Sequence, residues 1–147
     1  MATNGSTTFA AVNNLAFIYK NESGPYFPSL QAFSAALNQA TGEKVAVNQN
    51  TGKIEWDDKL PSTPYGAAAV TKNVVVTTTH NGDLYAFNAT TGAIPQKIPL
   101  SAGTNAPVAI DSDYVIAGAG LPHSQAHQAL IAFRPGANGK LPGTVVS

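Results

Sequence analysis

The hydrophobic pattern of residues 65–100 predicts four short β-strands in succession. The second strand is a run of Val and Thr, whose β-branched side chains suit a pleated, half-buried surface. The third strand alternates, so that Tyr85 and Phe87 point to one face of the sheet and Leu84 and Ala86 to the other. The four strands are expected at 67–71, 73–79, 84–88 and 93–100.

Two turn signals separate these strands. Asn81 followed by Gly82 favours a two-residue hairpin turn in which both positions have φ > 0. Thr91 followed by Gly92 marks the turn before the fourth strand. Four antiparallel strands of this length make one blade of a β-propeller.

The same pattern recurs along the chain at a spacing of 40 residues. The motif Ala-x-Asn-x-x-Thr-Gly begins at Ala46 and again at Ala86, and the segment AVTKNVVV from Ala69 aligns with AIDSDYVI from Ala109. A third copy of the third strand, LIAFRPG, has Ala132 where Ala86 stands. A period of this length is typical of propeller blades.

These repeats predict a single all-β domain, residues 1–147, made of three four-stranded propeller blades. The blades are expected at 7–60, 65–100 and 106–147, and the third is expected to end in a strand at 140–147. In the first blade, a turn is expected at Asn13 and Asn14, with strands at 7–12, 14–21, 44–49 and 53–60.

Residues 22–42 fit no strand pattern and are interpreted as an insertion between the second and third strands of the first blade, or as a local duplication, since ALNQATG at Ala36–Gly42 matches the repeat motif. Ser29 could cap a short amphipathic helix there, and Gly42 could close it. Coil is the alternative for this segment.

Charge and composition exclude several classes of protein. Eight Lys and Arg balance eight Asp and Glu, and the pI is near 6.8, which argues against binding of nucleic acid or of an anionic membrane surface. The absence of Cys excludes disulfides and thiolate metal sites. No run has the length of a membrane span, and no signal peptide is visible at the N-terminus.

The segment AVNQNTGKIEW, residues 46–56, resembles the tryptophan-docking repeat of the pyrroloquinoline-quinone (PQQ)-type quinoprotein propellers. The resemblance implies that the Ala fills a tight slot, that Thr-Gly makes the turn, and that Trp56 wedges against the neighbouring blade. It therefore assigns structural roles to Trp56, Gly52 and Gly92. The predicted hairpin turn assigns a structural role to Gly82 as well. The second copy has Gln96 where the Trp is expected, and the third copy lacks the Thr-Gly.

The resemblance also implies a periplasmic or extracellular location. Dehydrogenases of the family hold PQQ and calcium with Glu, Asn, Asp and Arg side chains, and in many members with a vicinal disulfide. This chain has no Cys and its only Arg is Arg134, so no cofactor-binding or catalytic residue can be carried over, and PQQ is not expected. The repeat also occurs in relatives that bind no quinone, including scaffold proteins of outer-membrane assembly.

Two groups of side chains are candidates for metal binding. Asp111 and Asp113 flank Ser112 in a predicted hairpin loop and could hold a calcium ion, although Asp is common in such loops for turn reasons alone. His123 and His127 are four residues apart and could form a zinc pair, but Pro122 favours a loop.

Other polar residues have plainer interpretations. His80, Asn81 and Asp83 surround the predicted hairpin of the second blade, where turn formation explains them. Glu55, Asp57 and Asp58 are expected on a solvated outer edge.

Two functional hypotheses of different classes follow, with a third behind them. The first is a non-catalytic quinoprotein-like module that acts as a scaffold or binding surface. The alternative is a calcium-dependent hydrolase of lactonase or esterase type on a six-bladed propeller. The third is a fragment of a PQQ-dependent dehydrogenase.

Three blades cannot close a ring, so the outer flanks of the first and third blades are expected to be exposed and apolar. A second copy of the chain, related by a two-fold axis, would complete a six-bladed ring, with any small-molecule ligand on the axis. The flanks are expected to contain Ala10, Ala11, Val12, Ala16, Ile18, Val108, Ile110, Val115, Ile116 and Ile131.

Overall fold

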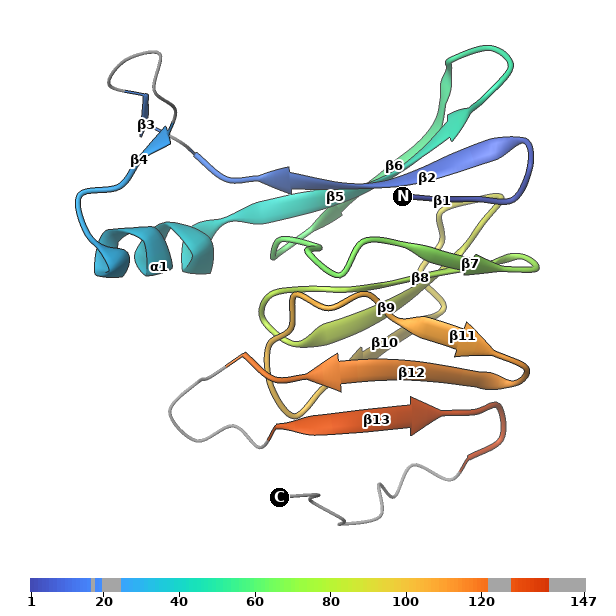
Figure 1. Ribbon diagram of the computed structural model, residues 1–147. Helices are drawn as coiled ribbons and strands as arrows, with labels where there is room; N and C mark the ends of the chain where they lie inside the picture. Colours follow the sequence, from blue (N-terminus) through green and yellow to red (C-terminus); the bar gives the residue numbers. More distant parts are fainter. Residues whose placement is uncertain (17, 20–24, 122–127, 138–147) are drawn as a thin grey trace.

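The computed structural model describes residues 1–16, 18–19, 25–121 and 128–137. Three antiparallel sheets lie one beside the next in chain order, and a helix and a small two-stranded sheet project from the end of the first (Figure 1). The first sheet has the order β1-β2-β5-β6, the second β10-β9-β8-β7 and the third β11-β12-β13. This all-β arrangement confirms the predicted class of propeller blades.

The first sheet contains β1 (Ala2–Thr3), β2 (Thr7–Asn14), β5 (Thr41–Asn48) and β6 (Ile54–Leu60). The turn predicted at Asn13 and Asn14 is wrong, because both residues continue β2 and pair with Gly42 and Thr41 of β5. The strand predicted at 14–21 is wrong as well. Within that range β3 (Ile18–Tyr19) pairs only with β4 (Pro25–Tyr26), outside the blade.

The insertion lies between β2 and β5, which are the second and third strands of the first sheet. Of the two alternatives, helix is correct: α1 (Leu30–Gln39) begins after Ser29, whose Oγ accepts a hydrogen bond from the backbone N–H of Ala32 at 3.1 Å. The helix ends at Gln39 with Ala40 as its C-terminal cap, so Gly42 does not close it. Gly42 instead lies in β5, where an added Cβ would come within 2.1 Å of Pro64 Cδ.

The second sheet contains β7 (Ala69–Thr71), β8 (Val74–Thr78), β9 (Asp83–Asn88) and β10 (Gln96–Pro99). Its central hairpin differs from the predicted two-residue turn. Thr79 N–H donates to Asp83 O at 2.9 Å and Gly82 N–H to Thr79 O at 3.0 Å, which closes a three-residue loop. Gly82 has φ 90° and Asn81 does not have positive φ, so this is a three-residue hairpin with a glycine bulge.

The third sheet contains β11 (Ala109–Asp111), β12 (Tyr114–Ala119) and β13 (Ala129–Phe133). The fourth strand expected at 140–147 lies outside the described residues. The first strands of successive sheets, β1, β7 and β11, contact one another in turn, as innermost propeller strands do.

Two boundaries between sheets contain the core, and β9 contributes to both. Its Tyr85 and Phe87 pack with Trp56 against the first sheet, while Leu84 packs with Val108 against the third. The alternation predicted for this strand is therefore confirmed.

Several residues expected on the open flanks are part of this core instead. Val108 and Ile131 are buried, and Ile110 and Val115 pack against the cluster between the second and third sheets. The expectation failed because strand alternation puts every second residue on the opposite face, and the sequence did not say which face was covered.

Candidate functional site

The repeated motif forms the same turn twice. Asn48 N–H donates to Lys53 O and Gly52 N–H to Asn48 O, both at 2.9 Å; Asn88 N–H donates to Ala93 O at 2.8 Å and Gly92 N–H to Asn88 O at 2.9 Å. In each copy the Asn Oδ1 accepts two backbone N–H groups, at 3.0 and 3.1 Å in the first copy and both at 3.0 Å in the second. Asn is therefore the capping residue of the motif.

The Gly of each motif turn has positive φ, 68° at Gly52 and 77° at Gly92. Gly92 has a second constraint, because an added Cβ would lie 2.6 Å from Asp58 Oδ2 and 3.0 Å from the Trp56 ring. The turn of the second sheet is therefore also a docking surface for the first.

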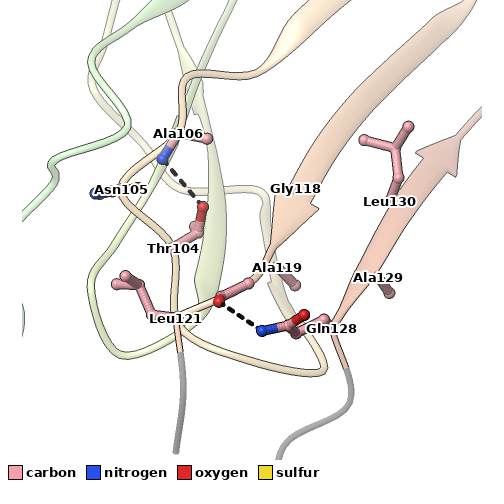
Figure 2. A pocket seen from close by; sticks show the side chains of 10 residues that line it. Thr104, Asn105, Ala106, Gly118, Ala119, Leu121, Gln128, Ala129 and Leu130 are labelled. Carbon is pink, nitrogen blue, oxygen red and sulfur yellow. Dashed lines mark hydrogen bonds between the residues drawn. The ribbon is translucent and has the colours of Figure 1, made fainter. Parts of the chain in front are cut away.

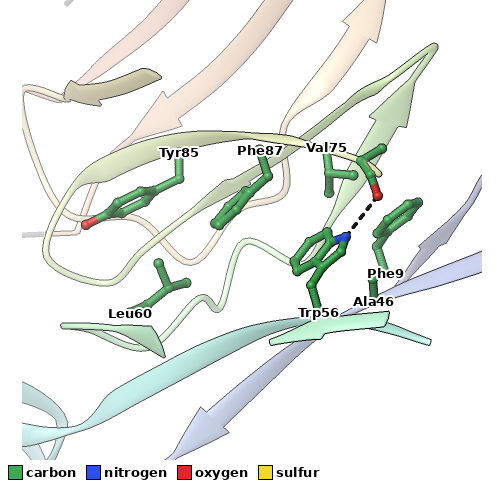
Figure 3. Close-up of a cluster of buried hydrophobic side chains, with 8 residues drawn as sticks. Phe9, Ala46, Trp56, Leu60, Val75, Tyr85 and Phe87 are labelled. Atoms are coloured by element: carbon green, nitrogen blue, oxygen red, sulfur yellow. Dashed lines mark hydrogen bonds between the residues drawn. The ribbon is translucent and has the colours of Figure 1, made fainter. Parts of the chain in front are cut away.

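Trp56 lies across the boundary between the first and second sheets (Figure 3). Its ring is 5.8 Å from that of Phe87 with an interplanar angle of 12°, and 5.9 Å from that of Phe9. Its indole Nε1–H donates to Ala89 O at 2.9 Å, and Ala46, its partner in the strand register, is fully buried. The structure thus places Trp56 where the docking motif requires it.

A cavity of about 520 Å³ lies where β12 ends and β13 begins, beside the linker that enters the third sheet (Figure 2). Gln128 Nε2 donates to Gly120 O at 3.4 Å, and Thr104 Oγ1 accepts from Ala106 N–H at 3.1 Å. Leu130 projects from β13 at its edge and is 79% exposed. The cavity is lined by Thr104, Asn105, Ala106, Gly118, Ala119, Gly120, Leu121, Gln128, Ala129 and Leu130.

This lining does not suit a quinone cofactor. PQQ is an anionic, carboxylated quinone that is held with calcium, and a site for the pair needs cationic and carboxylate side chains. The described residues that line the cavity include no cationic and no carboxylate side chain, so this cavity does not fit PQQ with calcium. For the protein as a whole, the absence of PQQ and the binding of calcium stay predictions.

The structure places Asp111 at the exposed end of β11, and Ser112 and Asp113 form the two-residue turn that follows it, with Ser112 at φ 52°. The corresponding turn of the second sheet has Lys72 at φ 49°. Within the described residues no group of three His, Asp or Glu side chains could hold a metal ion. A calcium ion at this Asp pair remains a prediction.

The other candidates are dispersed. His123 and His127 lie outside the described residues. His80 packs its ring edge-on against Tyr65 at 6.1 Å and borders a hollow of about 290 Å³. Asp83 accepts from Lys97 Nζ at 2.9 Å, and this hydrogen bond raises the pKa of Lys97.

The burial of Lys44 and the partial burial of Asp58 were missed from the sequence. Lys44 is fully buried with no hydrogen-bond partner for its Nζ, and burial lowers its pKa to about 7. Asp58, expected on a solvated edge, has its Oδ2 buried without a partner, and burial raises its pKa, with a further contribution from Asp57. The internal repeat could have indicated this burial. Strand register places Lys44 where the second sheet has Leu84, and Asp58 where it has Ile98.

Comparisons with known proteins agree with this geometry. A family model described as outer membrane protein assembly factor BamB matches residues 12–137. Among solved structures, a europium-containing methanol dehydrogenase matches with a TM-score of 0.52 at 13% sequence identity. That match covers 66% of this chain and 21% of the enzyme's, so the chain spans about a fifth of that protein and shares its fold. No curated protein matches.

No helix among the described residues has the length and apolar character needed to cross a membrane. The repeated Asn-capped turns, the docked tryptophan and the extent of the family match lead to one conclusion. The chain belongs to the PQQ-type β-propeller repeat family whose model bears the name of the assembly factor BamB.

Proposed function

We propose that this protein is a non-catalytic propeller module whose role is to bind another protein surface through its open sheet flanks. The partner proposed first is a second copy of the chain, so that two three-bladed arcs form one ring. The support comes from the internal repeat, which provides within the chain an example of how such a flank is covered.

The observation that carries the proposal is the exposure of Leu130. Strand register places it at the same repeat position as Lys44 in the first sheet and Leu84 in the second. Those two residues are covered by the next sheet and are 0% and 3% exposed, whereas Leu130 is 79% exposed. The same repeat position is therefore buried in the first and second sheets and exposed in the third.

Leu130 belongs to a continuous apolar strip, here called the third-sheet flank. Its members alternate with the residues that face the second sheet, as expected for two adjacent strands. The strip consists of Tyr114, Ile116, Gly118, Leu130 and Ala132. An exposed apolar strip of this kind marks an interaction site.

The opposite side of the arc provides a complementary surface, here called the first-sheet flank. By register, Val45 and Val47 stand where the second sheet has Tyr85 and Phe87, the residues that pack against the neighbouring sheet. The small and mostly apolar part of the flank consists of Thr8, Ala10, Val12, Val45 and Val47, of which Val45 is already buried. The same face also carries Glu43, Asp57 and Lys59, which form ion pairs with one another. In the proposed dimer it packs on the third-sheet flank of the partner, and the two-fold axis makes the two contacts equivalent.

The test is the solution mass of the protein over a concentration series, measured by light scattering. We expect a dimer for the native chain and a monomer for Leu130→Asp, because a carboxylate on the flank would be desolvated in the interface. Leu30→Asp is the matched control: Leu30 is 82% exposed on α1, away from both flanks. A folded native monomer, or equal association of the two variants, would refute the proposed dimer.

A periplasmic or extracellular location is proposed on the same basis as the family assignment, since the family description names an outer-membrane assembly factor. Fractionation of cells that express the full gene product tests it. Recovery with the cytoplasmic fraction would contradict it.

A further inference from the structure

We propose that the crevice between the second and third sheets is a vacant tryptophan-docking slot, and that it binds a small planar aromatic molecule with a ring N–H, of which indole is the simplest. The proposal does not depend on the module being a dimer. It rests on a point-by-point correspondence between this crevice and the slot that Trp56 fills.

The near wall of the crevice repeats the near wall of the Trp56 slot. In the first sheet, Ala46 pairs with Phe9 on one side and with Trp56 on the other. In the second sheet, Ala86 pairs with Val76 on one side and with Gln96 on the other. Position 96 is thus where the docking indole would originate, and Gln96 is exposed instead.

The far wall corresponds as well. Around Trp56 it is formed by Val75 and Phe87, which pair with each other in the second sheet. In the crevice it is formed by their equivalents Val115 and Phe133, which pair in the third sheet. A ring entering the crevice would therefore stack on Phe133 as Trp56 stacks on Phe87.

The hydrogen-bond acceptor is also repeated. Trp56 Nε1–H donates to the carbonyl of Ala89, the residue that follows Asn88. In the third sheet the residue after the equivalent Arg134 is Pro135, and it lines the crevice. Its carbonyl oxygen is the predicted acceptor for the N–H of the bound ring.

The size and character of the crevice suit such a ligand. Its volume is about 190 Å³, and its walls are mainly aliphatic and aromatic side chains. Apolar cavities of about 150 Å³ in proteins accept a benzene-sized molecule. The slot is therefore large enough for a bicyclic ring that approaches from the open side.

The first test titrates the native chain with indole and follows the methyl resonances of Val76, Leu84 and Val115 by NMR. We expect saturable shifts of these methyl groups and of the other methyl groups that line the crevice, and none elsewhere. We expect 1-methylindole, which lacks the N–H, to bind about threefold to tenfold more weakly, the range expected for one hydrogen bond. Unshifted methyl resonances up to the solubility limit of indole, or equal binding of 1-methylindole, would overturn the proposal.

The second test fills the slot from within. Gln96→Trp should dock its own ring, abolish the indole-induced shifts and add a blue-shifted component to the fluorescence. Ile54→Trp is the control, because Ile54 is a 63% exposed strand residue outside the crevice. Gln96→Phe provides the same blocking test if the larger ring prevents folding. Indole binding that is unchanged in a folded Gln96→Trp or Gln96→Phe chain would contradict the assignment of the slot.

Discussion

The indole N–H of Trp56 and the carbonyl oxygen of Ala89, 33 positions apart in the chain, form a 2.9 Å hydrogen bond across the boundary between the first and second sheets. Both residues are buried, so the two groups have each exchanged water for the other. The bond fixes the lateral position of one sheet on the next, while the rings of Phe9, Trp56 and Phe87 pack against one another at the same boundary.

Trp56→Ala should therefore lower the free energy of unfolding by about 3–5 kcal/mol, the usual cost of removing a large aromatic side chain from a core. Trp56→Phe should cost less, because a ring remains between Phe9 and Phe87; the losses are the hydrogen bond to Ala89 and the part of the buried volume that the larger indole fills. Denaturant titration followed by circular dichroism measures both. The native chain should have blue-shifted fluorescence, and an emission maximum typical of a water-exposed indole would contradict the packing.

Asn88→Ala should loosen the turn that carries Ala89. Its Oδ1 caps the N–H groups of Thr90 and Thr91, and the loss should cost about 1 kcal/mol. It should also move the Trp56 emission to longer wavelength, because the acceptor of the indole N–H is no longer held. Asn88→Asp keeps an acceptor oxygen at the same place and should show a smaller shift, which makes it the control.

Lys44→Leu should raise stability at neutral pH, since it replaces an unpartnered buried ammonium with the residue that the second sheet has at this position. The pKa of Lys44 is lowered by burial to about 7 in the folded chain, against 10.5 for the ordinary side chain. Between these pH values the unfolded state binds more protons, so stability rises with pH by up to about 1.4 kcal/mol per unit.

Below pH 7 both states of Lys44 are protonated and its contribution levels off. The stability difference between Lys44→Leu and the native chain should therefore be largest at and below pH 7 and should shrink as the pH approaches 10. Urea titrations at several pH values measure this difference. A difference that does not change between pH 7 and pH 10 would mean that Lys44 reaches water in the folded protein.

Gly82→Ala and Gly52→Ala form a matched pair that separates backbone strain from steric overlap. Both residues have positive φ, which costs an L-residue about 1–2 kcal/mol. An added Cβ at Gly52 meets nothing within 4 Å, whereas at Gly82 it would lie 2.6 Å from Ala102 O. Gly82→Ala should therefore be the more destabilising in thermal unfolding, and equal effects would show that the linker at Ala102 can move aside.

Sequence alone was sufficient where a signal was local and repeated. The alternation of Tyr85 and Phe87 with Leu84 assigned both faces of β9, and the motif spacing located Trp56 at a boundary between sheets. The turn at Asn13 and Asn14 was predicted wrongly because pairing with β5 outweighed the preference of Asn for turns.

The burial of the Lys44 side chain and of the Asp58 carboxylate could not be predicted from the sequence, for a different reason. Lys44 and Asp58 look like surface residues in any local window, since Lys and Asp are rarely buried without partners. Only the comparison of each position with its equivalent one repeat later, Leu84 for Lys44 and Ile98 for Asp58, indicates that the two side chains face the second sheet. Likewise, the vacancy beside Gln96 is visible only after the strands have been brought into register.

The two boundaries between sheets are packed unequally, because one contains Trp56 and the other has Gln96 at the equivalent position. The boundary between the first and second sheets is held by an aromatic stack and a buried hydrogen bond. The boundary between the second and third sheets has an open crevice at the equivalent place. Stability in a protein is distributed among local units, and the unit with fewer buried contacts opens first. Under a pulling force applied to the two ends of the chain, the third sheet should therefore separate from the second before the second separates from the first.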